Sequence, residues 1–145
     1  SVGQIVLSGK NKDLEKLSSF FKEIKIKNIK LPVSAPFHCS LMKKATEIMN
    51  KELQKLNFKK GNNVLISNIT ADEIFNEDEL KDLLTKQIEN RVRWRESVLN
   101  MINKGVNNFI EIGPGKVLSG LIKRINKDVE VISINNEDDI KRIKI

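Results

Sequence analysis

Hydrophobic positions recur along this chain with two spacings, one typical of helices and one typical of strands. Apolar residues at three- and four-residue steps predict amphipathic helices over 11–24, 40–57, 76–88, 94–105 and 116–125. Compact or alternating apolar runs predict strands over 3–9, 25–33, 63–69, 107–113 and 129–134. Ser40 is the expected cap of the second helix, and the charged tail from residue 135 is expected to add a helical turn or two. The strand–helix–strand order from residue 64 onward predicts a parallel α/β sheet.

The composition is that of one globular domain with a core of its own. The chain has 145 residues, of which 39% are hydrophobic and 31% are charged. A single cysteine makes no intramolecular disulfide, which favours a reducing compartment. No apolar run is long enough to cross a bilayer, and the start does not resemble a signal peptide. We therefore expect a soluble protein without a membrane partner, in a bacterial cytoplasm or in a plastid or mitochondrion.

The chain is basic, and this charge suits an acidic partner. Its 26 Lys and Arg residues outnumber 19 Asp and Glu residues and give a net charge of +7. Nucleic acid is a weak candidate, because the lysines are scattered, tyrosine is absent and aromatic residues make up only 5%. A non-catalytic basic α/β module that binds an anionic partner is one functional hypothesis.

Two further patterns suggest sites but lack the residues that those sites need. The stretch "GPGKVLSG" at 113–120 does not fit the GxxxxGK frame of a phosphate loop, so it predicts a strand that turns tightly into a helix. An anion at the start of that helix stays an alternative. One histidine and one cysteine, adjacent in sequence, do not make a metal site, and we expect no metal.

The only histidine and the only cysteine stand side by side in "LPVSAPFHCSLMKKA". Neighbouring side chains diverge, so Cys39 is a poor nucleophilic partner for His38. A neutral imidazole accepts a proton at pH 7, and a helix start just after it, together with Lys43 and Lys44, disfavours the charged ring. His38 is therefore a candidate general base, and a packed loop histidine is the alternative.

Several stretches, in order along the chain, resemble the malonyl-CoA:acyl carrier protein transacylase family of type II fatty-acid synthesis. They are "SVGQIVLSG", "LPVSAPFHCSLMKKA", "VLISNITA", "LLTKQIENRVRW" followed by "RESV", and "FIEIGPGKVLSGLIKRI". The resemblance implies an α/β fold: part of a small ferredoxin-like subdomain over 1–33, and the C-terminal part of an α/β-hydrolase-like parallel-sheet subdomain over 34–145. It also implies Ser-His ping-pong transfer of a malonyl group from malonyl-CoA to the phosphopantetheine thiol of acyl carrier protein, without a cofactor.

The resemblance assigns roles to three residues. His38 matches the family's general base and acid, and Gln87 matches the residue whose backbone carbonyl orients that histidine. For Gln87 the alternative is a helix-terminal amide of no special role. Phe37 matches the position that accompanies acyl choice in related polyketide acyltransferases, where phenylalanine goes with malonyl. An ordinary loop aromatic is the alternative for Phe37.

The family's nucleophile motif is missing from this chain. No serine has a glycine two residues away on both sides, as a G-x-S-x-G elbow requires. The malonyl-binding arginine and the oxyanion-hole donors of the family belong to the same N-terminal part. The resemblance thus covers roughly the C-terminal half of an enzyme. We expect this chain to need the N-terminal half, to be inactive alone and to expose an apolar sheet face.

Overall fold

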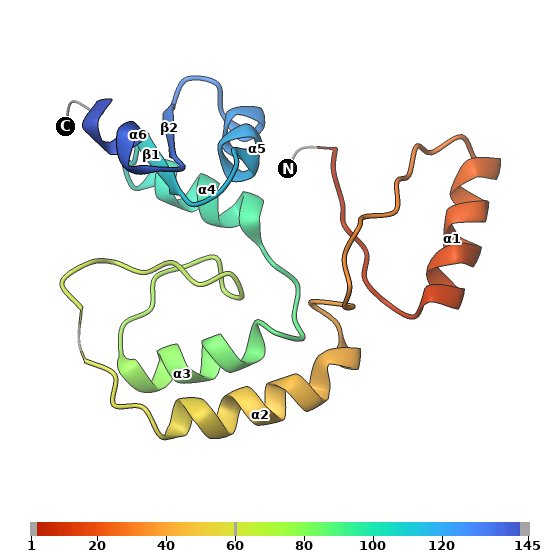
Figure 1. The fold of residues 1–145 in the computed structure, drawn as a ribbon, viewed down its shortest axis with the longest axis horizontal. Helices are drawn as coiled ribbons and strands as arrows, with labels where there is room; N and C mark the ends of the chain where they lie inside the picture. Colours follow the sequence, from red (N-terminus) through yellow and green to blue (C-terminus); the bar gives the residue numbers. More distant parts are fainter. Residues whose placement is uncertain (1–2, 60, 143–145) are drawn as a thin grey trace. The chain divides into compact units, whose positions relative to one another are not determined.

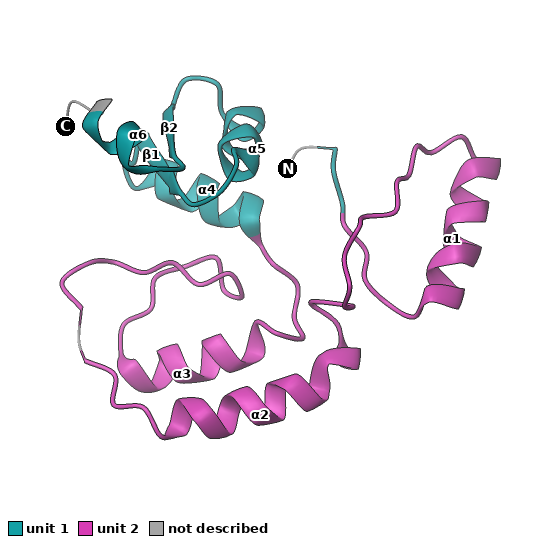
Figure 2. Cartoon of the chain, in the orientation of Figure 1, with its two compact units in different colours: residues 1–5, 94–145 teal, residues 6–93 magenta. Residues whose placement is uncertain are grey.

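The computed structural model describes residues 3–59 and 61–142 of the chain. Along the sequence these residues form α1 (Asn11–Glu23), the 3-10 helix η1 (Ser40–Met42), α2 (Lys43–Gln54), α3 (Glu77–Lys86), α4 (Trp94–Asn103), β1 (Asn108–Ile112), α5 (Val117–Ile125), β2 (Glu130–Ile134) and α6 (Glu137–Arg142) (Figure 1). The chain divides into two compact units, one of residues 1–5 and 94–145 and one of residues 6–93 (Figure 2). The subdomain boundary expected between residues 33 and 34 falls within the 6–93 unit and stays a prediction.

The 94–145 unit contains a β1–α5–β2 crossover. The two strands pair in parallel, from Asn108 opposite Glu130 to Ile112 opposite Ile134. Parallel strands need a crossover connection, and α5 supplies it within this unit. The predicted parallel sheet is therefore confirmed, and the chain has the α/β fold expected from its sequence.

The two faces of this sheet differ in burial because successive strand residues point to opposite sides. Phe109 and Val131 pack against a core cluster of Val98, Ile122 and Val129. On the other face Ile110 and Ile112 are 49% and 80% exposed. An apolar sheet face is thus exposed, as predicted.

The 6–93 unit is built from helices and loops. The side chain of Asn76 caps α3 by accepting a hydrogen bond from the Glu79 N–H at 2.8 Å, and acidic residues fill the first turn. Helix α2 packs against α3, and each contributes one buried leucine, Leu53 and Leu83. None of the helices within 3–59 and 61–142 combines the length and apolar character needed to span a membrane.

Three predicted strands do not form. Residues 3–9 and 25–33 contain no strand, and in 63–69 the only pairing among the described residues is an isolated antiparallel bridge from Ile66 to Glu73. An apolar run becomes a strand only where a neighbouring strand completes its hydrogen bonds. The described part of the chain offers 3–9 and 25–33 no such neighbour, and 63–69 pairs with 72–74 too briefly to form a strand. The predicted tail helix does form as α6, and its residues 143–145 lie outside the described residues.

Candidate active site

His38 lies in the loop between α1 and η1 with a backbone conformation that is uncommon for its residue type. Its φ angle is +62°, in the left-handed region. Such a conformation costs a non-glycine residue about 1–3 kcal/mol and persists only where surrounding contacts hold it. The contacts of His38 therefore bear directly on its role.

Two carbonyl groups at the end of α3 hold His38. The His38 N–H donates to the Ile88 carbonyl at 3.0 Å, and the ring Nδ1 lies 2.9 Å from the Gln87 carbonyl oxygen. Gln87 is the C-cap of α3, where the last carbonyls of a helix have no partner within the helix. The main chain and the ring of His38 thus use carbonyls that the helix leaves free. The structure brings together His38 and Gln87, which are 49 positions apart in the sequence.

This contact determines which ring nitrogen can act as a base. A carbonyl oxygen only accepts hydrogen bonds, so Nδ1 carries the hydrogen and Nε2 keeps its lone pair. The His38 side chain is exposed, which leaves Nε2 accessible. A neutral imidazole held in this way can take a proton from a hydroxyl or thiol.

The structure places a further helix end beside His38 that the sequence pattern did not indicate. The sequence pattern pointed to the positive start of the following helix and to Lys43 and Lys44. In the structure the ring contacts the C-terminal end of α3, where helix carbonyls carry partial negative charge. The expectation considered only one of the two helix ends that matter.

The predicted cap at Ser40 is wrong. Ser40 is the first residue of η1, Cys39 precedes it as the cap residue, and α2 begins after Met42. Neither cap residue makes a side-chain hydrogen bond with its helix. A turn of 3-10 helix therefore separates His38 from α2. The capping propensity of one serine does not indicate such a turn.

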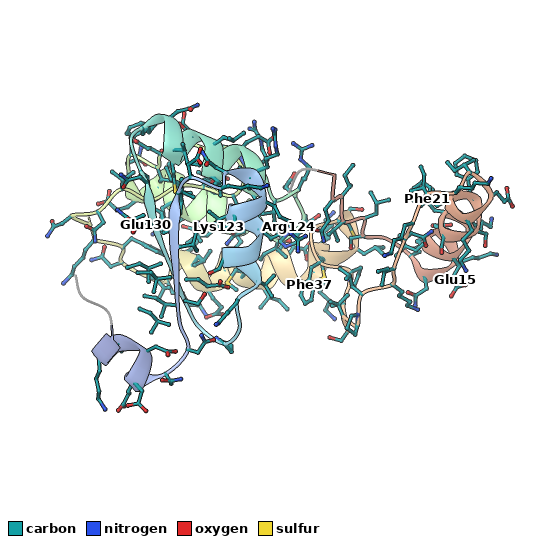
Figure 3. The ribbon with its side chains drawn as sticks, turned by 90° about the horizontal axis from the view of Figure 1, so that it is seen from above. Glu15, Phe21, Phe37, Lys123, Arg124 and Glu130 are labelled. Atoms are coloured by element: carbon teal, nitrogen blue, oxygen red, sulfur yellow. The ribbon has the colours of Figure 1, made fainter. Side chains whose placement is uncertain are left out.

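The neighbours of His38 in the sequence have other surroundings. The Cys39 thiol donates to the Pro36 carbonyl at 3.1 Å, and the Ser8 hydroxyl donates to the Cys39 sulfur at 3.7 Å. Phe37, labelled in Figure 3, is 49% exposed. Its proposed part in acyl choice stays a prediction.

The GPGK turn of the 94–145 unit has the predicted strand–turn–helix form. Gly113 and Gly115 have φ angles of +139° and +93°, which favour glycine. At the start of α5 the N–H groups of Leu118 and Ser119 donate to the Glu111 carboxylate at 3.0 and 2.7 Å. The Ser119 hydroxyl donates to the same carboxylate at 2.6 Å.

Glu111 thus occupies the place at which an external anion would bind this helix. The hydrogen bond from the Ser119 hydroxyl, followed by that from the Ser119 N–H, lowers the pKa of Glu111. Burial opposes this lowering, and the Leu118 N–H adds the smallest contribution to it. The anion-binding alternative therefore loses its best-placed donors.

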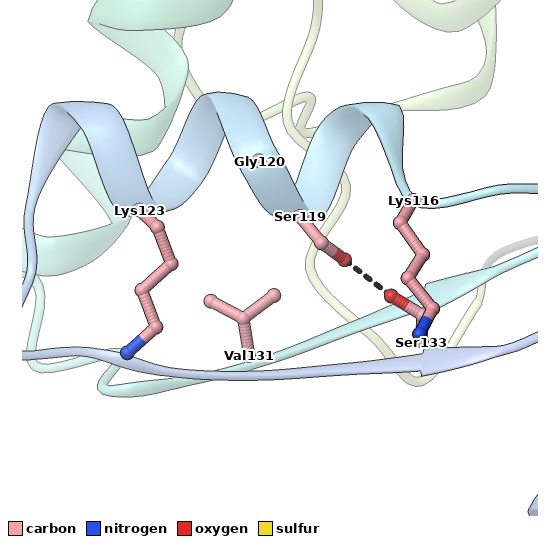
Figure 4. Close-up of a pocket in the computed structure, with 6 residues that line it drawn as sticks. All are labelled: Lys116, Ser119, Gly120, Lys123, Val131 and Ser133. Atoms are coloured by element: carbon pink, nitrogen blue, oxygen red, sulfur yellow. Dashed lines mark hydrogen bonds between the residues drawn. The ribbon is translucent and has the colours of Figure 1, made fainter.

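A hollow of about 390 Å³ lies between α5 and β2 (Figure 4). It is lined by Lys116, Ser119, Gly120, Lys123, Val131 and Ser133. The hydroxyls of Ser119 and Ser133 are 2.7 Å apart, and the Lys123 ammonium donates to the Val129 carbonyl at 2.7 Å. Most polar groups of this hollow already have protein partners. Within the described ranges no three His, Cys, Asp or Glu residues are grouped so as to hold a metal ion.

Fold and site together define an α/β protein in which a main-chain carbonyl contacts the ring of an exposed histidine. No family model matches the chain. Its sequence is 41% identical over 140 residues to the malonyl CoA-acyl carrier protein transacylase of Bacillus subtilis (strain 168). It is 38% identical over 140 residues to the protein of the same name in Staphylococcus aureus (strain COL). These alignments cover 96% of this chain but 44% and 46% of the relatives, so the chain spans slightly less than half of their length.

Solved structures agree with the sequence comparison. The Clostridium perfringens malonyl CoA-acyl carrier protein transacylase is 42% identical with a TM-score of 0.82, over 89% of this chain and 41% of that structure. The acyl carrier protein S-malonyltransferase of Vibrio cholerae is 37% identical with a TM-score of 0.86, over 94% and 45%. The chain is therefore homologous to part of the malonyl CoA-acyl carrier protein transacylases, an acyltransferase family.

One contact of the site carries no signal in the sequence. The Ile88 carbonyl receives the His38 N–H, but every residue type supplies a carbonyl. The carbonyl of Gln87 was named only through the resemblance, for the same reason.

Proposed function

We propose that the protein containing this chain transfers a malonyl group from malonyl-CoA to the phosphopantetheine thiol of acyl carrier protein in fatty-acid biosynthesis. This chain supplies the histidine, and a serine outside it supplies the nucleophile. The observation that carries the proposal is the 2.9 Å contact of His38 Nδ1 with the Gln87 carbonyl. The names of the relatives support the choice of substrates.

Each half of the proposed reaction moves one proton through His38. In the first half, Nε2 takes the serine proton while the serine oxygen attacks the thioester carbonyl, and the ring then returns that proton to the departing CoA sulfur. In the second half, Nε2 takes the proton of the carrier-protein thiol, which attacks the serine ester. The ring then protonates the departing serine oxygen. The Gln87 carbonyl holds the ring throughout and stabilises its charged form.

An acyl carrier protein is the proposed macromolecular partner. A malonyl-transacylase in complex with its type II polyketide synthase acyl-carrier protein has the same fold, with a TM-score of 0.85 and 30% identity over 92% of this chain. The net charge of +7 suits an acidic carrier. Transfer rates at low carrier concentration should fall as ionic strength rises past about 0.1–0.15 M, because screening weakens attraction between exposed charges.

A chimera tests the proposal. This chain replaces the aligned residues of the Bacillus subtilis relative, and malonyl transfer from malonyl-CoA to carrier protein is measured. We expect an active chimera, and His38→Ala should lower kcat by roughly a thousandfold, as expected for loss of a general base. Cys39→Ala, at the adjacent position, is the matched control and should stay within a factor of about three of the parent.

The outcomes separate the proposal from its rivals. An active chimera that keeps its rate after His38→Ala overturns the role of His38 as the general base. The hypothesis of a non-catalytic basic module predicts that result. The 145-residue chain alone should show no transfer, and full activity of that chain would contradict the need for an external serine.

Two smaller effects test the assigned neighbours. Gln87→Ala keeps the backbone carbonyl, so it should lower the kcat of the chimera much less than His38→Ala does. An equal loss of kcat contradicts the carbonyl's role.

Phe37→Ser should raise turnover of a methylmalonyl thioester relative to malonyl, because a smaller side chain leaves room for the extra methyl group. An unchanged ratio contradicts a part for Phe37 in acyl choice.

A further inference from the structure

Residues 67–72 form a closed loop held by its own hydrogen bonds. Ser67 is 6% exposed, and its hydroxyl accepts from the Ile69 N–H at 3.0 Å. Its carbonyl accepts from the Ala71 N–H, and its N–H donates to the Asp72 carbonyl, each at 2.9 Å. Ala71 is 5% exposed and has a φ of +59°, so the loop also holds a non-glycine residue in the left-handed region. These contacts give the loop one defined conformation.

This loop contacts both ends of residues 87–93, the segment whose first two carbonyls hold His38. At one end the Asn68 carbonyl accepts from the Arg93 N–H at 2.9 Å, and the Arg93 guanidinium donates to the Thr70 carbonyl at 2.9 Å. At the other end the Asn68 side-chain amide donates to the Gln87 side-chain oxygen at 3.4 Å. Asn68 therefore touches Gln87 with its side chain and Arg93 with its main chain.

The contact between Asn68 and Gln87 lies beside a mainly apolar hollow of about 220 Å³. Its other lining residues come from the 65–74 stretch and from α3, and they are Leu65, Ile66, Ser67, Ile74, Leu80, Leu83 and Leu84. The walls of this hollow are mostly apolar, and Asn68 is a hydrogen-bond partner that the structure gives to the Gln87 side chain. The position of that amide is therefore sensitive to Asn68.

We propose that Asn68 is a positioning residue for His38: it holds Gln87, whose carbonyl holds the imidazole. The chain of contacts runs from Asn68 Nδ2 to Gln87 Oε1, and from the Gln87 carbonyl to His38 Nδ1. A partner of this kind acts by keeping the ring in one tautomer and one orientation. This role rests on the proposed function of His38 as the base, but its effect on the ring is measurable without activity.

Ring ¹⁵N NMR on the 145-residue chain measures that effect, because His38 is the only histidine. In the parent at a pH where the ring is neutral, Nδ1 should be protonated and Nε2 unprotonated. Asn68→Leu, which removes the amide donor at similar size, should shift both nitrogens toward the average of two exchanging tautomers. Thr70→Ala is the matched control in the same loop, since it keeps the carbonyl bound by Arg93, and it should leave the ring spectrum unchanged.

The active chimera supplies the second measurement. Asn68→Leu should lower kcat roughly tenfold, with KM changed less than about twofold. If Asn68 acts through the Gln87 side chain, the same substitution should cost less than about twofold in a Gln87→Leu background, which keeps the carbonyl but lacks the amide. A full tenfold loss in that background overturns the proposed route.

A separate pair of variants changes the contact between Arg93 and the loop while leaving Asn68 and the loop residues intact. Arg93→Lys keeps a donor for the Thr70 carbonyl and should retain more activity than Arg93→Met, at equal protein stability. Parent-like ring shifts and parent-like kcat in Asn68→Leu overturn the positioning role, and so does an equal loss in Thr70→Ala. A chimera whose rate survives His38→Ala overturns the proposed function instead, while the ring spectrum still decides whether Asn68 orients His38.

Discussion

Both strands predicted after residue 94 form, whereas the three predicted before it do not. The apolar runs look alike in the two regions, but among the described residues only β1 and β2 form a ladder, each with the other across α5. The helices of both regions form where the hydrophobic spacing predicts them. A helix completes its hydrogen bonds within one segment, but a strand depends on a second segment that its own pattern does not specify.

Burial follows the same division. The 94–145 unit has a core of its own around Val98, which is fully buried. In the 6–93 unit the apolar residues of the unformed strands are largely exposed, for example Ile29 at 74% and Val64 at 70%. The unit that carries His38 is therefore stabilised mainly by helix contacts and loop hydrogen bonds, and its site depends on polar contacts more than on packing.

The largest effect on stability should come from the core of the 94–145 unit. Val98→Ala removes two methyl groups from a side chain with 0% exposure and should destabilise this unit by about 2 kcal/mol. Urea unfolding followed by the fluorescence of Trp94, the only tryptophan, reports it because this residue packs against the core cluster. Val117→Ala, at a position 71% exposed, is the control and should stay within about 0.5 kcal/mol. Equal effects would contradict a separate core in this unit.

A smaller effect tests the strain at His38 in the other unit. Alanine is disfavoured at a φ of +62° and glycine is not, so His38→Gly should be more stable than His38→Ala by about 1 kcal/mol. Both variants lack the imidazole and differ only in backbone preference. Hydrogen exchange of amides in α2 and α3 measures the difference, and a more stable alanine variant would show that the left-handed conformation is not maintained.

The side-chain cap of α3 should contribute a similar or slightly smaller amount to the free energy of unfolding. Asn76→Ala removes the acceptor of the Glu79 N–H and should cost about 1 kcal/mol. Asn76→Asp keeps an acceptor and should restore most of the loss. Faster hydrogen exchange in the first turn of α3 is the expected signature, and unchanged protection in Asn76→Ala would contradict the capping role.

The smallest effect should come from Glu111 and depend on pH. Because the folded protein lowers the pKa of Glu111, its stabilising contribution is complete above the ordinary glutamate value of about 4.3 and is lost as pH falls through the lowered value. Glu111→Gln should therefore be less stable than the parent at pH 7, with a difference that shrinks in acid. Trp94 fluorescence unfolding at several pH values measures it, with Glu130→Gln on the neighbouring strand as control. A difference that stays constant with pH would show that the charge is not what matters.

Much of the fold was predictable from local pattern, and little of the site's geometry was. Acidic residues follow Asn76 in the first turn of α3, and Gly105, with a φ of +94°, follows α4, so short-range chemistry marks both helix ends. Ser40 fits the pattern of a cap equally well, but the chain forms a 3-10 turn there instead. Candidate caps compete over a few residues, and their surroundings decide between them.

The site shows where local pattern stops being informative. His38 was a candidate base from its residue type, and the family resemblance named Gln87 as its partner. The contacts with Gln87 and Ile88 join positions about 50 residues apart through main-chain carbonyls, which no side-chain pattern encodes.

The helices, the strand–helix–strand order that predicts a parallel sheet, the basic charge and the one imidazole can all be read from the sequence. These follow from the spacing of apolar residues and from composition, both local properties. The folded chain is needed to see which apolar runs become strands, which helix end contacts His38, and that Glu111 lies at the start of α5. Each of these depends on groups distant in sequence that meet in space, so their partners are known only once the chain is folded.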